Sequence, residues 1–169
     1  MLRAATPDAG PAASAATFVA GMKDEQAALT AFTALLQHEQ DALVEGDAER
    51  LALLAADKAT QIELLTHLGA LRSRHLAAQN LSGSAEGMLA WLNRNPGFAA
   101  AVKKIWRDLL ARAETALQIN ESNGLLIQNR LQQNRLKLAV LQTAAASDGV
   151  YRRDGQMRPL HGARSLSQT

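Results

Sequence analysis

The chain has 169 residues, of which Ala supplies 34 and Leu 27, while Val, Ile and the aromatic residues together supply only 15, so its composition favours helices and argues against a β-sheet. It contains no cysteine, which excludes disulfides, cysteine nucleophiles and thiolate metal sites. The net charge is only +2, but residues 1–97 carry 7 basic and 11 acidic side chains, whereas residues 98–169 carry 11 and 5. These opposite signs would help the two parts pack antiparallel, or help the second part attract an acidic partner.

The first residues show no helical pattern. Residues 1–16 are rich in Ala, Pro and Gly, which predicts a disordered leader. Pro7, Asp8 and Gly10 stand where a signal peptide needs its apolar core, so we predict no signal peptide and a cytoplasmic protein. No apolar run approaches the roughly 20 residues that cross a bilayer, so we also predict no membrane insertion.

Two helices are predicted next, over residues 17–45 and 48–80. Gly46 is suited to the left-handed backbone at a helix end, and Asp47 is suited to capping the helix that follows. Because this connection is so short, the two helices should form an antiparallel hairpin. Residues that recur at three- and four-residue spacing predict the facing stripes: Met22, Leu29, Phe32, Leu36 and Leu43 on the first helix, and Leu51, Leu54, Lys58, Ile62, Leu65, Leu68, Arg72 and Leu76 on the second.

A short helix over 85–94 and a long helix over 98–145 complete the pattern, with a break at Pro96 between them. The long helix has one stripe that is apolar at both ends and amide-rich in the middle: Val102, Ile105, Leu109, Ala113, Ala116, Asn120, Asn123, Ile127, Leu131, Asn134, Leu138 and Leu141. Residues 147–169 read as a flexible basic tail. The sequence therefore predicts an all-α fold: one helical domain over 17–146, built as an antiparallel hairpin plus one long C-terminal helix in a coiled-coil-like bundle, with disordered termini.

Enzyme signatures are missing. The chain has no phosphate-binding glycine loop, no dinucleotide fingerprint and no nucleophile elbow. His67 and His75 share one face of their helix with Glu63 nearby, but no further ligand stands at suitable spacing, so we predict no metal. Acidic pairs such as Asp47 and Glu49 lie at helix starts, where they stabilise the helix dipole. We therefore predict no catalytic residue, no cofactor and no enzyme activity.

The basic second part invites comparison with nucleic-acid-binding proteins, because Lys and Arg clusters supply affinity for phosphate. Here the basic residues are spread over residues 103–164 without helix-turn-helix spacing or an aromatic stacking platform. We predict no nucleic-acid partner. A helical nucleic-acid-associated protein stays as the rival function, and a structural coiled-coil adaptor as a third.

The segment 120–127, Asn-Glu-Ser-Asn-Gly-Leu-Leu-Ile, is the most informative. Gly124 inside a helix costs about 1 kcal/mol relative to Ala, and buried amides need partners. The segment therefore needs a close backbone approach, a bend or a polar partner. Two interpretations stand: an amide that controls the register of the bundle, as in coiled coils, or a groove in which another polypeptide lies against the long helix.

Several motifs in this order resemble the FlgN family of flagellar type III export chaperones. They are Gly46-Asp47-Ala48-Glu49-Arg50-Leu51 at the hairpin turn, Lys58 in the second helix, Asn120-x-x-Asn123-Gly124-x-Leu126-Ile127 in the long helix, and Tyr151-x-x-Asp154-Gly155-Gln156 after it. The resemblance covers residues 17–157. The leader and the residues after 158 have no counterpart in it.

The resemblance implies a chaperone that binds the C-terminal helical segments of the hook–filament junction proteins FlgK and FlgL in the cytosol, prevents their premature assembly and brings them to FlhA at the export gate. It implies a client-binding site on the long helix and gate docking through Tyr151. The predicted client-binding residues are Asn120, Asn123, Gly124, Leu126, Ile127, Leu131, Asn134, Leu138 and Leu141. Leucine and isoleucine would anchor a client helix and the amides would set its register. Without a client, the stripe should be buried in a homodimer or against the hairpin.

Overall fold

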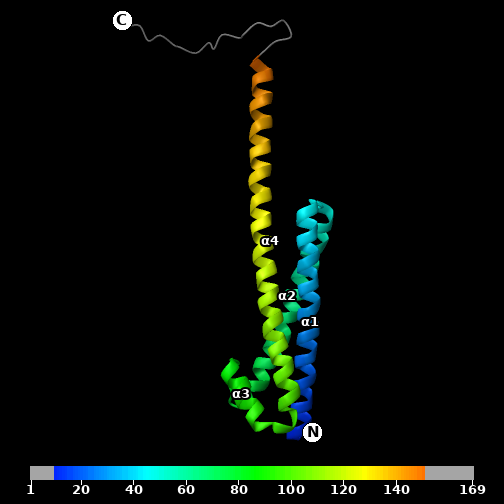
Figure 1. The fold of residues 1–169 in the computed structure, drawn as a ribbon, viewed down its shortest axis with the longest axis vertical. Coiled ribbons are helices and arrows are strands. Elements are labelled where there is room, and N and C mark those ends of the chain that lie inside the picture. Colours follow the sequence, from blue (N-terminus) through cyan, green and yellow to red (C-terminus); the bar gives the residue numbers. More distant parts are fainter. Residues whose placement is uncertain (1–9, 151–169) are drawn as a thin grey trace, which may run out of the picture. The chain divides into compact units, whose positions relative to one another are not determined.

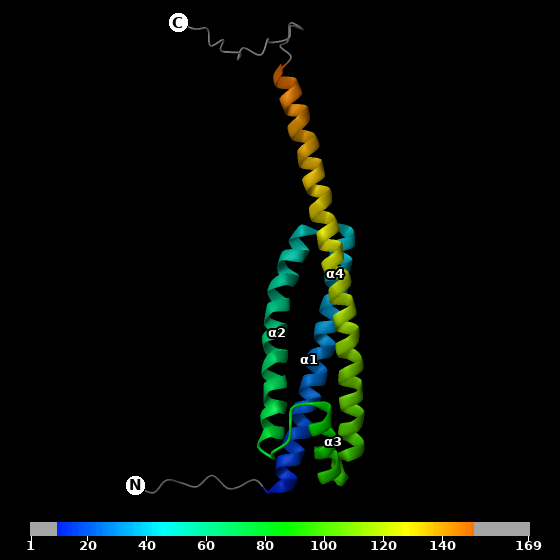
Figure 2. The same cartoon turned by 90° about the vertical axis from the view of Figure 1, so that its left-hand side faces the viewer.

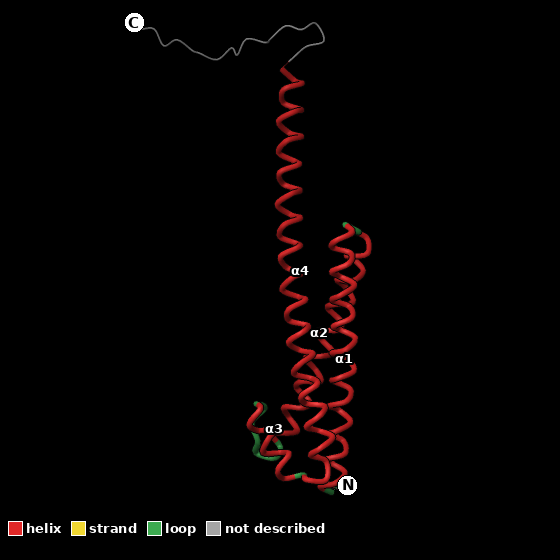
Figure 3. The backbone as a smooth tube through the Cα atoms, viewed as in Figure 1, coloured by secondary structure: helices red, strands yellow, loops and turns green. Residues whose placement is uncertain are grey.

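The computed structural model describes residues 10–150, in which four helices and no strand occur (Figure 3). The helices are α1 (Pro11–Glu45), α2 (Ala48–Ala77), α3 (Ala85–Arg94) and α4 (Pro96–Val150). The predicted all-α fold is therefore confirmed. The chain divides into two compact units between Leu126 and Ile127, so that α4 contributes to both. The single domain expected over 17–146 stays a prediction.

In the first unit, α1 and α2 form the predicted antiparallel hairpin and lie side by side (Figures 1 and 2). Gly46 adopts the left-handed conformation at φ 81°, and its backbone N–H donates to the carbonyl of Ala42. The carboxylate of Asp47 accepts a hydrogen bond of 2.9 Å from the backbone N–H of Arg50, which caps α2. The turn therefore forms for the reasons that the sequence indicated.

Four helix ends differ from the predicted ones, and one of them is the start of α4, which lies at Pro96 and not at residue 98. α1 starts at Pro11, so residues 11–16 are helical where a disordered leader was expected, because proline suits the first helical turn and Ala15 is buried in the core. α2 ends at Ala77 before Asn80, which has a positive φ of 57°. α4 reaches Val150, so residues 147–150 of the expected tail are helical, since the preceding alanines extend the helix. Residues 1–9 and 151–169 lie outside the described part.

The core of the first unit lies where α1 begins and α2 ends, against α3 (Figures 1 and 2). Trp91 and Met88 of α3 are fully buried there. Their partners in this cluster are Ala15, Phe18, Met22, Leu76, Leu92, Val102, Ile105 and Leu109. Ser84 caps α3 by accepting from the backbone N–H of Gly87. A Cβ on Gly87 would collide with the carbonyl of Ser82, so glycine allows the loop to fold back onto this helix.

The predicted stripe of α4 is buried only in part. Val102, Ile105, Leu109, Ala116 and Asn123 are buried, whereas Ala113 and Asn120 are exposed. Around Asn123, α4 bonds to α1, and Ser122 there accepts a hydrogen bond from Gln40. The buried face is therefore turned toward α1, and side chains on the other flank stay open.

Candidate functional site

Asn123 lies at the centre of a buried polar cluster that joins three helices. Its side-chain amide donates to the backbone carbonyl of Leu36 and to Oε2 of Glu39, each at 2.9 Å. Lys58 of α2 donates to the two oxygens of the same Glu39 carboxylate at 2.8 and 3.1 Å. Asn123 is 1% exposed and Glu39 7%. This geometry favours the register interpretation for Asn123, since its donors are used inside the chain.

A second buried pair lies nearer the start of α1. Arg72 of α2 binds Glu25 of α1 through two hydrogen bonds, at 2.9 and 3.3 Å, and its guanidinium lies 4.9 Å from the ring centre of Trp106 on α4. The sequence placed Lys58 and Arg72 on the inner stripe of α2 but missed their acidic partners. The available signal was a cation at a seam position, which requires a carboxylate on the facing helix.

Gly124 stands in open space. A Cβ added there would meet no atom within 4 Å, so the glycine serves neither close helix packing nor a tight contact. It lies within α4, which the structure gives as one helix through this residue. The neighbouring Leu126 is partly buried and Asn120 is exposed. Of the predicted site residues in the first unit, only Asn123 is fully enclosed.

The remaining predicted residues lie in the second unit, which among the described residues is a single helical segment over 127–150. Its predicted anchors are exposed, from 40% for Ile127 through 52% for Leu131 and 58% for Leu138 to 64% for Leu141. Asn134 between them is also exposed. These five side chains lie on one face at about 3.6 residues per turn. Tyr151, the predicted gate contact, lies outside the described residues.

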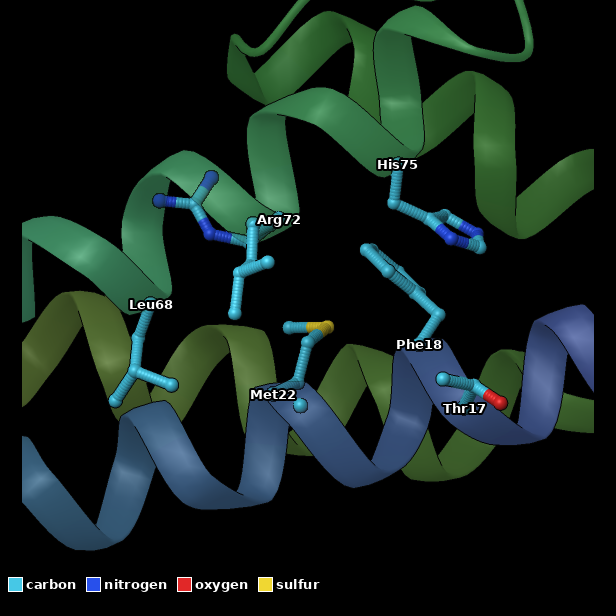
Figure 4. A pocket seen from close by; sticks show the side chains of 8 residues that line it. Thr17, Phe18, Met22, Leu68, Arg72 and His75 are labelled. Carbon is cyan, nitrogen blue, oxygen red and sulfur yellow. The ribbon is translucent and has the colours of Figure 1, made fainter.

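A cavity of about 220 Å³ lies between the start of α1 and the end of α2 (Figure 4). It is lined by Thr17, Phe18, Gly21, Met22, Leu68, Leu71, Arg72 and His75. The imidazole of His75 stacks on Phe18, with 4.3 Å between ring centres, and desolvation lowers the pKa of this histidine. The polar side chains in its lining are Thr17, Arg72 and His75, and Arg72 is already paired with Glu25.

Residues 10–150 hold neither a membrane-spanning helix nor a metal-binding cluster. No helix in that range is both long and apolar enough to span a membrane. Within the same range, no three His, Asp or Glu side chains gather where they could hold a metal ion. The polar clusters of the first unit are thus ion pairs and amides within the bundle.

Comparison with known proteins gives one match. Residues 14–159, most of the chain, match the family model described as "FlgN protein". Searches of curated proteins and of solved structures give no match. The match spans the hairpin, the buried amide cluster and the exposed stripe of α4. The chain therefore belongs to the FlgN family, a family of flagellar export chaperones.

Proposed function

We propose that the protein binds the C-terminal helical segments of FlgK-like and FlgL-like hook–filament junction proteins in the cytosol, keeps them from assembling and delivers them to the export gate. The client helix lies along the second part of α4, on the stripe formed by Ile127, Leu131, Asn134, Leu138 and Leu141, which we call the client stripe. Binding is stoichiometric and ends in transfer, with no chemical step. The single observation that carries the proposal is the exposure of this stripe in a chain of the FlgN family.

The helical register of α4 supports this placement. The residues of α4 that are buried in the first unit, such as Leu109, Ala116 and Asn123, share one helical face. The same three- and four-residue spacing continues in the sequence through Ile127 and Leu131, whose side chains are exposed. The stripe therefore has the residue pattern of a helix-packing surface, on which a client helix packs in helix-in-groove fashion.

The composition of the stripe's flanks indicates the chemistry of the client. Residues 127–145 hold Arg130, Arg135 and Lys137 and no acidic residue. A client helix with an apolar stripe and carboxylates beside it would complement this surface in both respects. Such a helix would self-associate when left uncovered, which is the event that a chaperone prevents.

Paired substitutions on opposite faces of α4 test the proposal. Replacing Ile127→Asp and Leu131→Asp puts charge into the client stripe, so we expect FlgK-like and FlgL-like segments to bind at least about 100-fold more weakly. Leu136→Asp and Val140→Asp form the matched control, because both residues are exposed and lie on the other side of the helix. The control should bind within about threefold of the natural chain.

The readout is titration of labelled client segments by fluorescence anisotropy, with circular dichroism as the check on helicity. Unchanged binding by the Ile127→Asp, Leu131→Asp protein would rule out the client stripe. Equal loss in both pairs would show that binding does not follow one face of α4.

Gate docking is assigned to Tyr151, in keeping with its place just after the long helix in the family pattern. We expect Tyr151→Ala to keep client affinity and to weaken binding to the cytoplasmic part of FlhA by about tenfold, because an aromatic anchor is removed. Tyr151→Phe is the conservative control. A Tyr151→Ala protein that loses its client but keeps FlhA would place this residue in client binding instead.

A further inference from the structure

A second candidate surface lies within the first unit. A groove of about 440 Å³ runs between α3 and α4. It is lined by Leu89, Leu92, Ala100, Lys103, Lys104, Trp106, Arg107 and Leu110, and we call it the α3–α4 groove. Two of its leucines are well exposed, Leu89 at 57% and Leu110 at 51%. An apolar floor beside cationic side chains is thus open on the surface of the bundle.

The basic wall of the groove is only partly neutralised. Lys104 pairs with Asp108 at 3.0 Å, and Nε of Arg107 lies 3.8 Å from the same carboxylate. The hydrogen bond from Lys104 holds the pKa of Asp108 below its usual range. Among the described residues, no ion pair involves Lys103. The wall formed by α4 carries Lys103, Lys104 and Arg107 and pairs two of them with the single carboxylate of Asp108, so it keeps an excess of positive charge.

We propose that the α3–α4 groove docks a short acidic amphipathic helix of a partner protein. Apolar side chains of that helix lie over Leu89 and Leu110, and its carboxylates face Lys103 and Arg107, so that shape and charge are both matched. The wall from Ala100 to Leu110 is about 15 Å long at 1.5 Å per residue, which suits a helix of about three turns.

The floor of the groove favours a polypeptide over a nucleic acid. Leu89, Leu92 and Leu110 offer no hydrogen bond to phosphate or base edges. Trp106 is the one aromatic ring in the lining, and the Arg72 guanidinium lies over it. A row of stacking platforms, on which single-stranded nucleic acid binding depends, is therefore missing from this lining.

The test uses the full chain and a defined probe. The probe is a labelled 12-residue helical peptide that carries Leu on one face and Glu on its flanks, and the paired peptide has Lys in place of Glu. An oligoadenylate and anionic lipid vesicles serve as competitors. All titrations use the Ile127→Asp, Leu131→Asp protein beside the natural chain, because the client stripe is also apolar and basic.

We expect saturable binding of the Glu peptide and at least about tenfold weaker binding of the Lys peptide. Lys103→Glu with Arg107→Glu should lower the affinity for the Glu peptide at least about tenfold, and Leu89→Ala with Leu110→Ala should do the same. Arg135→Glu with Lys137→Glu is the matched control, since it reverses the same number of charges farther along α4. Combined with Ile127→Asp and Leu131→Asp, which we call the stripe-disabled protein, this control should keep the affinity for the Glu peptide within about twofold. Circular dichroism verifies that each variant is folded.

Four outcomes overturn the proposal. Two concern the peptides: the Glu peptide does not bind saturably at millimolar concentration, or the Glu and Lys peptides bind equally well. In the third, the Arg135→Glu, Lys137→Glu control loses as much binding as the groove variants. In the fourth, oligoadenylate or vesicles displace the Glu peptide, and their own binding depends on Lys103 and Arg107 to the same degree. Because the stripe-disabled protein cannot hold a client, failure here leaves the proposed chaperone function unaffected, and the reverse also holds.

Discussion

Gly124 shows how one residue can be unusual in sequence and undemanding in structure. It occupies the middle of a helix, where glycine costs backbone entropy. Apart from its own helix backbone, nothing lies within 4 Å of the place where a Cβ would stand, so no packing constraint requires glycine there. We expected a polar partner within the segment 120–127, and it is found one residue before Gly124, at Asn123, whose amide donates to Leu36 and Glu39.

Gly124→Ala is therefore expected to stabilise the protein by about 0.5 to 1 kcal/mol, because alanine restricts the unfolded chain and strengthens the helix. Gly87→Ala provides the opposite case, since its Cβ would collide with the carbonyl of Ser82 and should cost more than about 2 kcal/mol. Urea unfolding followed by circular dichroism measures the two. A destabilised Gly124→Ala protein would mean that glycine is needed there for a bend or a contact.

At the level of single residues, the sequence was a good guide where the signal is local. Gly46 and Asp47 act as the turn and the cap that were expected. Glu25 and Glu39 were missed because a buried acid looks like a surface acid until its partner on another helix is known. Contacts between helices depend on alignment, and spacing within one helix does not encode it.

At the level of helices, number and type were predictable from Ala and Leu content and from the spacing of apolar residues. The helix ends were less predictable. α1 begins six residues before the expected start, because Ala15 and Phe18 pack into the core and this packing stabilises the first turns of the helix. The stripe on α4 was placed correctly at Leu109, Ala116 and Asn123. The sequence could not show that Ala113 and Asn120 would be exposed, since that depends on where the other helices lie.

The pair Glu39–Lys58 links α1 to α2 and predicts a strong dependence of stability on one lysine. Lys58→Met leaves the carboxylate largely enclosed, with only Asn123 as partner, and should cost about 2 to 3 kcal/mol. The double variant Glu39→Gln, Lys58→Met removes both charges, so its free energy of unfolding should lie within about 1 kcal/mol of that of the natural chain. Urea unfolding of the four proteins in this cycle gives the coupling between the two side chains. Equal stability of Lys58→Met and the natural chain would show that the pair is solvated and unimportant.

At the level of the whole molecule, the proposed function depends on which apolar surface stays open. The membership of the FlgN family and the exposure of the client stripe together support a binding role, and the identity of the clients stays a proposal. From sequence alone, the stripe could be located but its exposure could not, since the same pattern of residues would suit a helix sealed in a core. Only the structure distinguishes Asn123, which is enclosed, from Asn134, which is exposed.

An uncovered stripe should lead to self-association when no client is present. We expect the free protein to form a dimer as its concentration rises, and a client segment to convert it to a one-to-one complex. Ile127→Asp with Leu131→Asp should stay monomeric under the same conditions, because the apolar contact area is lost. Sedimentation velocity over a concentration series measures this, and a dimer that persists in both variant and client complex would place self-association on another surface.

The two carboxylates of α1, at residues 25 and 39, are separated by the same interval as the two cations of α2, at residues 58 and 72. If the hairpin slipped by a single heptad, Glu25 would lose Arg72 and Glu39 would lose Lys58 at the same time. Only the native alignment leaves both of these largely enclosed carboxylates paired, so a shift by one heptad costs both ion pairs together. Two helices so rich in alanine and leucine can pack in many registers, and these four ionic groups favour the native register over the others.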